Sequence, residues 1–234
     1  ENYNIVGRAK TKTDAHRPAA EICDSIAFAA KEALKAADLK IEDIVSAGIG
    51  TPGSVIPSEG IVTYTNNFSC FNNLPLCAML KERLGIDFYI ENDANAAAYG
   101  EYLAGAGVGT KDFVAVTLGT GVGGGIVLDG KLLTGCNDAG GEIGHIHVED
   151  NETDRCGCGK KGCLEQYGSA TGIVRIANRV LASTDEASVL RDGEISAKSV
   201  CDAAKANDDI ITTIPKITDN TFLSLISVPP LCQL

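Results

Sequence analysis

Residues 156–165 have the sequence CGCGKKGCLE, which places Cys156, Cys158 and Cys163 within one short glycine-rich loop. His145 precedes the first of these cysteines by eleven residues. One imidazole and three thiolates are the donor set of a tetrahedral zinc site, and the glycines let the loop fold back tightly. The spacing therefore predicts that the histidine and the three cysteines bind zinc.

The cysteines are also compatible with two simpler roles. The first is a disulfide or free thiols, but nine cysteines is an odd number and those outside the loop are scattered singly. Scattered cysteines are typical of core or surface thiols in a reducing compartment. The second is a zinc ion that only holds the loop together. Glu142 and Glu165 flank the predicted ligands, which favours a metal that organises a functional site.

Composition limits the kinds of protein that this chain can be. Its 234 residues suit one large domain or two lobes, and 44% hydrophobic residues suffice for a sizeable core. The net charge of −11 disfavours nucleic acid as a partner, because phosphate neutralisation needs clustered lysine and arginine. No apolar run approaches the roughly 18 residues of a membrane helix. No leader segment is visible, so we expect a cytoplasmic protein without a membrane partner.

The hydrophobic pattern predicts strands that alternate with helices. Strands are expected at residues 4–12, 45–50, 87–90, 113–118, 124–128 and 131–133. Helices are expected at residues 18–37, 74–84, 94–103, 170–182 and 197–206. Such alternation indicates an α/β fold with a mostly parallel sheet and antiparallel hairpins. Residues 105–112 are the best candidate for a hinge between two lobes, whereas the segment after residue 209 fits the end of a compact domain poorly.

Asp93 lies in the segment ENDANAAAYGE, which follows a predicted strand and begins a predicted helix. A side chain there projects from the carboxyl end of a parallel strand, where open α/β sheets bind ligands. A carboxylate in that position can take a proton from a substrate hydroxyl. The alternative is that Asp93 caps the helix, and the two roles do not exclude each other.

A glycine-rich run, GTGVGGG at residues 119–125, joins two predicted strands. Such a loop can present consecutive backbone N–H groups to a phosphate, although a tight hairpin that needs positive φ accounts for the glycines as well. The run is not the dinucleotide fingerprint, because a strand rather than a helix follows it. Asn66 and Asn67 follow a short apolar strand, and their amides suit either hydroxyl binding or an ordinary turn.

His145 and Glu142 lie three residues apart in the segment GGEIGHI. If one ring nitrogen of His145 binds zinc, the other can only form a hydrogen bond to a carboxylate or a hydroxyl. Glu142 then either binds a ligand directly or only supports the histidine. His147 points the other way on an extended segment, so we expect that it is not a metal ligand.

Five stretches together resemble the ROK family of sugar kinases and related repressors. They are GIGTPGSV (48–55), ENDANAAAYGE (91–101), LGTGVGGGIVLDGKL (118–132), GGEIGHI (140–146) and CGCGKKGCLEQYGS (156–169). They occur in the order of the family, and the chain is most similar to its glucokinases. The resemblance implies an actin-like (ribonuclease H-like) two-lobed α/β fold with lobes at residues 1–107 and 108–234. It also implies ATP-dependent phosphorylation of a hexose, glucose above all.

The resemblance implies a role for each matching residue. Asp93 would be the general base that takes the proton of the 6-hydroxyl while that oxygen attacks the γ-phosphoryl group of ATP. The other sugar hydroxyls would be bound by Gly53, Asn66, Asn67, Asn92, Glu142, His145 and Glu165. The phosphates of ATP with Mg²⁺ would be bound at Gly119, Thr120, Gly121, Gly123, Gly124 and Gly125. The zinc would be structural, with His145 touching both the metal and the sugar.

The chain departs from the family pattern in three places. The family opens with a glycine-rich first phosphate loop and closes with a glycine-rich adenosine motif; neither is found here, so both lobes are expected to be partial. Cys70 and Phe71 stand where the family commonly has Gly-Trp. A sugar-sensing repressor and an inactive kinase fragment remain as alternatives. The resemblance leaves the hexose open, because relatives with much the same residues phosphorylate N-acetylmannosamine, N-acetylglucosamine or fructose. It also implies a homodimer.

Overall fold

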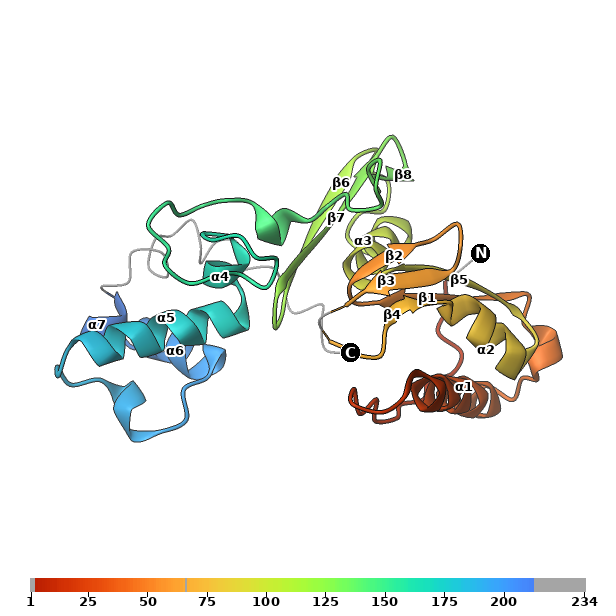
Figure 1. Ribbon diagram of the computed structural model, residues 1–234, viewed down its shortest axis with the longest axis horizontal. Helices are drawn as coiled ribbons and strands as arrows, with labels where there is room; N and C mark the ends of the chain where they lie inside the picture. The colour runs from red at the N-terminus through yellow and green to blue at the C-terminus, as the bar shows by residue number, and fades with distance from the viewer. Residues whose placement is uncertain (1–2, 66, 213–234) are drawn as a thin grey trace. The chain divides into compact units, whose positions relative to one another are not determined.

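The computed structural model describes residues 3–65 and 67–212, and the chain divides into two compact units (Figure 1). The first unit comprises Glu1–Val116 and Gly124–Glu142, and the second comprises Thr117–Gly123 and Ile143–Leu234. The elements of the first half of the chain are α1 (Ala19–Ala36), β1 (Ser46–Thr51), β2 (Ser54–Ile56), β3 (Ile61–Tyr64), β4 (Asn72–Leu74), α2 (Leu76–Leu84), β5 (Asp87–Asn92) and α3 (Asp93–Ala104). Those that follow are β6 (Phe113–Leu118), β7 (Val122–Leu128), β8 (Lys131–Leu132), α4 (Glu165–Gly168), α5 (Ala170–Ser183), α6 (Ala197–Lys205) and α7 (Asp209–Thr212).

A parallel sheet of β1 and β5 lies at the centre of the first unit, with Thr51 paired to Asn92 at its carboxyl end. α1 and α2 cover one face and share a core with it, in which Ile22, Leu80 and Ile90 are buried. α3 covers the other face, close to β1. β5 ends at Asn92 and α3 begins at Asp93, so both residues lie at the carboxyl edge of the sheet, as the sequence predicts.

A second, antiparallel sheet of β2, β3 and β4 packs on the same core. Val55 of β2 pairs with Val62 of β3, and both side chains are buried. β2 and β4 are not predicted from the sequence, because three-residue strands are too short to show an alternating pattern. This sheet places the loop after β3 beside the turn that joins β1 to β2.

The third sheet, β6–β7–β8, is the predicted hairpin region. Asp129 and Gly130 have φ values of 50° and 76°, as a tight two-residue turn between β7 and β8 requires. Gly125 of β7 lies so close to α3 that an added Cβ would overlap Ala98. This contact belongs to the first unit, so the boundary expected after residue 107 falls inside that unit. The assignment of the two lobes stays a prediction.

The strand expected over residues 4–12 is wrong. The segment has no regular structure, and Gly7 lies against α1, where an added Cβ would overlap the backbone oxygen of Ala33. A strand needs a neighbour for its hydrogen bonds, and no strand among the described residues pairs with this segment.

The second unit is built around α5, which begins and ends close to the predicted positions. Its core combines α5, α6 and α7, and Ile176, Val200 and Ile211 are buried there. The hydroxyls of Ser169 and Ser196 cap α5 and α6, which fixes where the two helices begin. Most of the segment after residue 209 that the sequence marks as unusual lies outside the described residues.

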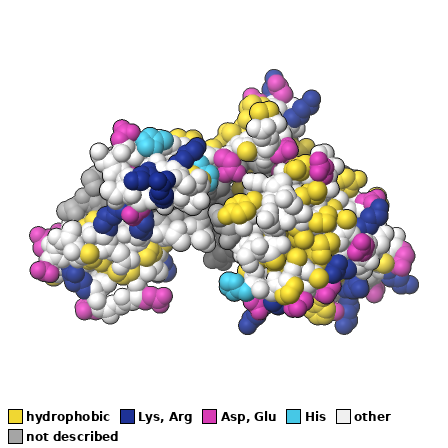
Figure 2. Space-filling view, viewed as in Figure 1, with side chains coloured by type: hydrophobic (Ala, Val, Ile, Leu, Met, Phe, Trp, Pro, Cys, Tyr) yellow, Lys and Arg dark blue, Asp and Glu magenta, His cyan; other side chains and the backbone are white. Residues whose placement is uncertain are grey.

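The surface carries mixed charge. Figure 2 shows acidic and basic side chains interspersed over both units, while most of the exposed large hydrophobic residues belong to the first unit. Within the described ranges, none of the helices combines the length and the apolar character needed to span a bilayer.

Candidate functional site

The start of α3 carries two of the predicted site residues. Asn92 is the N-cap of this helix, and its Oδ1 accepts hydrogen bonds from the N–H groups of Ala94 and Asn95 at 3.0 and 3.2 Å. Asp93 is the first helical residue, its side chain is exposed, and its Oδ1 accepts from the Ala94 N–H at 2.9 Å. The cap of α3 is therefore Asn92 rather than Asp93, so the carboxylate is not needed to end the strand and begin the helix.

Gly53 lies beside Asn92, whose Nδ2 donates to the Gly53 carbonyl at 3.1 Å. Gly53 has a φ of 94°, and an added Cβ would overlap the last residue of β3 and the side chain of Thr65, so this position requires glycine. The buried Thr65 hydroxyl accepts from the Asn67 N–H at 3.1 Å and donates to Asn67 Oδ1 at 3.3 Å. The structure thus brings three predicted residues together, while Asn66 lies outside the described residues.

Two residues that were not predicted support this group. Glu91 Oε1 accepts from the Asn92 N–H at 2.9 Å and from Asn95 Nδ2 at 3.1 Å. Asn95 is only 3% exposed, and its Oδ1 has no hydrogen-bond partner among the described residues. Gly141 lies next to that oxygen: a Cβ added at Gly141 would be 3.5 Å from Asn95 Oδ1. The backbone just before Glu142 therefore packs against α3. In the sequence, the feature that could have indicated this contact is the four-residue spacing of Glu91 and Asn95 across the end of β5.

The four predicted metal ligands converge in the second unit. The ligand atoms of His145, Cys156, Cys158 and Cys163 all lie within 4.8 Å of one another. Cys156 Sγ is 3.6 Å from His145 Nδ1, and Cys158 Sγ is 3.6 Å from Cys163 Sγ. Tetrahedral zinc with bonds of ~2.3 Å to sulfur and ~2.0 Å to nitrogen would separate a sulfur–nitrogen pair by roughly 3.5 Å and a sulfur–sulfur pair by roughly 3.8 Å. The donors therefore fit such an ion, and the sulfur atoms are too far apart for a disulfide, whose bond is about 2.05 Å.

The three thiols differ in acidity. Burial, reinforced by hydrogen bonds from its neighbours in the loop, raises the pKa of Cys163 to about 12, and burial also raises the pKa of Cys156. Burial acts in the same direction on Cys158, but hydrogen bonds from the Lys160 backbone and from Cys163 outweigh it and lower the pKa of Cys158. Cys158 is therefore the most acidic of the three.

The cysteine loop doubles back on itself through two glycines. Gly159 and Gly162 have φ values of 86° and 70°, a region that side chains disfavour. His147 lies on the extended segment that precedes the loop, and its ring contacts the Lys161 carbonyl at 3.0 Å and Asp150 at 2.8 Å. His147 lies outside the cluster of His145 and the three cysteines, and its exclusion from the metal ligands stays a prediction.

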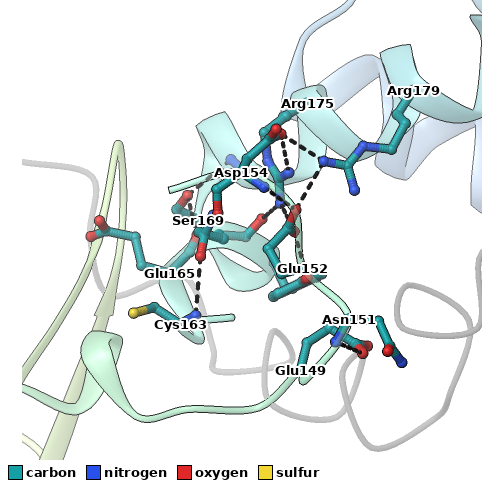
Figure 3. Close-up of polar contacts among 12 residues, drawn as sticks. Glu149, Asn151, Glu152, Asp154, Cys163, Glu165, Ser169, Arg175 and Arg179 are labelled. Atoms are coloured by element: carbon teal, nitrogen blue, oxygen red, sulfur yellow. Dashed lines mark hydrogen bonds and ion pairs between the residues drawn. The ribbon is translucent and has the colours of Figure 1, made fainter. Parts of the chain in front are cut away.

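A buried ionic cluster that was not predicted holds this loop on α5 (Figure 3). The side chain of Glu152 has no exposed surface and accepts hydrogen bonds from Tyr167 at 2.5 Å, Arg175 at 2.9 Å and Arg179 at 3.0 Å. Asp154 pairs with the same two arginines at 2.9 and 2.6 Å. Figure 3 shows both arginines reaching from α5 to the two carboxylates. The signal in the sequence was the pair of arginines four residues apart on one helix face.

This cluster is connected to the metal ligands. Burial alone would raise the pKa of Glu152, but hydrogen bonds from its arginine and tyrosine partners hold it well below its usual range. Burial and the neighbouring Glu152 raise the pKa of Tyr167 to about 12. Gln166 Nε2 donates to the Asp154 carbonyl at 3.1 Å, and its Oε1 accepts from the Cys163 N–H at 3.1 Å. The cluster therefore fixes both ends of the segment that carries the three cysteines.

Glu165 lies between the metal ligands and the glycine loop. Its Oε2 accepts from the Val122 N–H at 3.0 Å, and its Oε1 is 3.7 Å from the Cys156 thiol. A Cβ at Gly121 would overlap the Glu165 carboxylate. The alternative of a tight hairpin is correct in one part and wrong in the other. Residues 119–121 join the neighbouring strands β6 and β7, but none of the glycines in 119–125 has the positive φ that the alternative expects.

The predicted site residues thus form two groups, one in each unit. The first unit holds Gly53, Asn67, Asn92, Asp93, Gly124, Gly125 and Glu142. The second unit holds Gly119, Thr120, Gly121, Gly123, His145, Cys156, Cys158, Cys163 and Glu165. An apolar cavity of about 460 Å³ beside α1 has only apolar side chains and glycine in its lining, such as Ile26 and Phe88, and offers no group for catalysis.

Comparison with known proteins gives consistent results. The family model described as "ROK family" matches residues 1–221. The glucokinase of Halalkalibacterium halodurans is 39% identical over 208 residues, which cover 87% of this chain and 63% of that protein. The glucokinase of Thermotoga maritima is 42% identical over 171 residues, which cover 71% of this chain and 54% of that protein. The chain therefore spans between 54% and 63% of the length of these two relatives.

A solved structure and a regulator complete the comparison. The ROK family glucokinase from Streptomyces griseus, crystallised with glucose and AMPPNP, has a TM-score of 0.70 at 36% identity, over 88% of this chain and 66% of that one. The DNA-binding transcriptional repressor Mlc of Escherichia coli is 34% identical over 179 residues, 75% of this chain and 44% of that protein. The structural likeness confirms the expected actin-like α/β fold. Since the family model matches most of its length, this chain belongs to the ROK family.

Proposed function

We propose that this chain catalyses ATP-dependent phosphorylation of a hexose, with glucose as the substrate and glucose 6-phosphate as the product. The observation that carries the proposal is the exposed Asp93 carboxylate at the carboxyl end of β5, beside Asn92 and Gly53. The similarity to glucokinases supports the choice of glucose. The net charge of −11 supports small substrates rather than nucleic acid.

In this proposal Asp93 is the general base. Its carboxylate takes the proton from the 6-hydroxyl while that oxygen forms a bond to the γ-phosphorus of ATP, and the bond to the bridging oxygen breaks to release ADP. Because Asn92 caps α3, the start of the helix does not depend on the Asp93 carboxylate, whose Oδ1 accepts only from the neighbouring Ala94 N–H among the described residues. The group is thus available in position before the substrate arrives, which is what phosphoryl transfer requires of a protein.

The remaining residues bind the two substrates. The sugar hydroxyls are bound by Gly53, Asn66, Asn67, Asn92, Glu142, His145 and Glu165. The ATP phosphates, with Mg²⁺, are bound by the backbone of Gly119, Thr120, Gly121, Gly123, Gly124 and Gly125. Amide and carboxylate groups suit hydroxyls, and backbone N–H groups suit phosphate oxygens, which supports this division. Gly119 and Thr120 are exposed, whereas Gly124 and Gly125 are buried within β7, so the exposed start of the run carries the support for phosphate binding.

We also propose that His145, Cys156, Cys158 and Cys163 bind one structural Zn²⁺. The support is that the four ligand atoms lie within 4.8 Å of one another and that two of the pairs, each 3.6 Å apart, match the separation in a tetrahedral site. When bound, the ion would cross-link the cysteine loop to the segment of His145. The cysteines of the described residues are free thiols, which supports a reducing, cytoplasmic setting. For the assembly we propose a homodimer, as the resemblance to the family implies.

The test of the proposed function is a coupled ADP-release assay with a panel of hexoses. We expect the highest kcat/KM with glucose and lower values with fructose, N-acetylmannosamine and N-acetylglucosamine. Formation of glucose 6-phosphate is confirmed by mass spectrometry of the product. If no hexose releases ADP above the rate without sugar, the kinase proposal fails.

A sugar-sensing repressor is the second candidate, and the similarity to Mlc favours it. A repressor would bind the hexose, release no ADP and change its affinity for DNA when the sugar is present. Sugar binding by calorimetry, together with the ADP assay, separates the two functions. Sugar binding without turnover would favour the repressor or an inactive kinase.

A further inference from the structure

The glycine loop is attached to the start of α5 as well as to Glu165. The Ala170 N–H donates to the Gly119 carbonyl at 2.9 Å, and the Thr171 hydroxyl donates to the Thr120 carbonyl at 2.7 Å. Both contacts lie within the second unit. Two consecutive carbonyl groups of the loop are therefore turned toward α5.

This attachment also decides where two N–H groups point. In a trans peptide the C=O group and the following N–H group point in opposite directions. Because α5 holds the Gly119 carbonyl, the Thr120 N–H points away from that helix. Because Thr171 of α5 holds the Thr120 carbonyl, the Gly121 N–H points away from the helix as well. Neither N–H donates to any group among the described residues. The attachment thus turns two consecutive donors outward, an arrangement that binds anions.

We propose that Thr171 is a positioning residue that directs the Gly121 N–H toward a phosphate of ATP by holding the Thr120 carbonyl. The inference rests on the proposed use of the glycine loop for ATP. The contribution of Ala170 comes from its backbone, so any residue there supplies it. The contribution of Thr171 comes from its side chain, and a substitution can therefore remove it while the Ala170 bond stays.

The chain offers a matched control for this substitution. Thr110 lies in the first unit, and its hydroxyl donates to the Gly107 carbonyl at 2.7 Å, the same type of bond at the same length as that of Thr171. Thr110→Val and Thr171→Val therefore each remove a hydroxyl-to-carbonyl hydrogen bond of the same length, but only the bond of Thr171 reaches the glycine loop. Thr171→Val also removes a contact of 3.0 Å with the Ser169 hydroxyl, which caps α5, so the melting temperature of each variant is measured beside its affinity. Thr171→Ser keeps the hydroxyl and serves as the rescue variant.

The experiment compares the unaltered full chain with Thr171→Val, Thr171→Ser and Thr110→Val. Calorimetry gives the dissociation constant of MgATP, and steady-state kinetics give separate KM values for ATP and for glucose. We expect Thr171→Val to weaken MgATP binding about threefold to tenfold and to leave the KM for glucose unchanged. Thr171→Ser and Thr110→Val should bind MgATP as the unaltered chain does. Hydrogen exchange of residues 119–122 should be faster in Thr171→Val alone.

Three results would overturn the inference: unchanged MgATP affinity in Thr171→Val, no recovery in Thr171→Ser, or an equal loss of glucose and ATP binding. A chain that binds no MgATP would overturn it too. The proposed function fails separately if MgATP binds but no hexose is phosphorylated. In that case the binding data for the Thr171 variants still decide the inference.

Discussion

Asp93 and Asn92 divide two tasks between neighbouring residues. Asn92 caps α3 and binds the Gly53 carbonyl, whereas the carboxylate of Asp93 remains exposed at the first turn. A change at Asp93 therefore leaves the cap in place, so its effect on chemistry can be measured without loss of the fold.

Asp93→Asn should lower kcat by about 100-fold to 10,000-fold, because an amide cannot accept the proton of the sugar hydroxyl. The dissociation constant of glucose and the melting temperature should stay near those of the unaltered chain. Asp87→Asn, at the other end of β5 and 62% exposed, is the control and should keep full turnover. Substantial turnover in Asp93→Asn would show that another group accepts the proton.

Gly121→Ala tests the close approach of the glycine loop to Glu165. The added methyl group would overlap the end of the flexible Glu165 side chain and displace its carboxylate from the Val122 N–H, at a cost of about 0.5–1.5 kcal/mol in unfolding free energy for the lost hydrogen bond. At Gly119 nothing lies within 4 Å of an added Cβ, so Gly119→Ala should have nearly the stability of the unaltered chain. Denaturant unfolding of both variants checks this, and equal stabilities would contradict the close contact.

At the scale of helices and strands, the buried carboxylate of Glu152 connects the cysteine loop to α5. Its pKa is lowered in the folded state, so its contribution to stability is complete above its unfolded pKa of about 4.3. That contribution is lost as the pH falls below this value toward the lowered folded pKa. The second unit should therefore lose stability on acidification below about pH 4.3.

Glu152→Gln should remove this part of the acid dependence. At pH 7 it should cost about 2–3 kcal/mol, less than for a fully buried ion pair because Arg175 and Arg179 are 26% and 48% exposed. Asp202→Asn, which breaks the exposed pair with Lys198, is the control and should change little. Unfolding curves measured between pH 7 and pH 3 check the prediction, and parallel acid profiles for Glu152→Gln and the unaltered chain would refute it.

The elements that the sequence predicts correctly are those whose signals are local. α1, α3, α5 and β6 are long enough to show a period, and the β7–β8 turn has its own Asp-Gly signature. The segment 4–12 has a strand-like pattern, yet it packs on α1 because a strand depends on a partner that the pattern cannot supply. The short strands β2 and β4 are recognised only through their pairing with β3.

The same distinction holds for the site. The metal ligands were predicted because three of them lie within eight residues, and Asp93 because it follows a strand directly. The contacts of Glu152 with Arg175 and of Thr171 with Thr120 were not predicted, since they join residues 23 and 51 positions apart. Such pairs are created by the fold, and no spacing rule in a single sequence marks them.

At the scale of the whole molecule, all four metal ligands belong to the second unit. Metal content should be about one zinc per chain, and removal of zinc by a chelator should destabilise the second unit while the first keeps its protection against hydrogen exchange. Cys158→Ser should lower the metal content, whereas Cys136→Ser, an exposed cysteine of the first unit, should not. Equal metal content in the two variants would show that the ligands are assigned wrongly.

The tips of β6 and β7 have a consequence for how this chain can be divided. Residues 117–123 are part of the second unit, while the rest of both strands belongs to the first, so the chain passes between the units after residues 116, 123 and 142. A fragment that starts at residue 143 would lack the loop held by Ala170 and Thr171, and one that ends at residue 142 would carry that loop without its support. A single cut in the chain therefore cannot separate the second unit intact from the first.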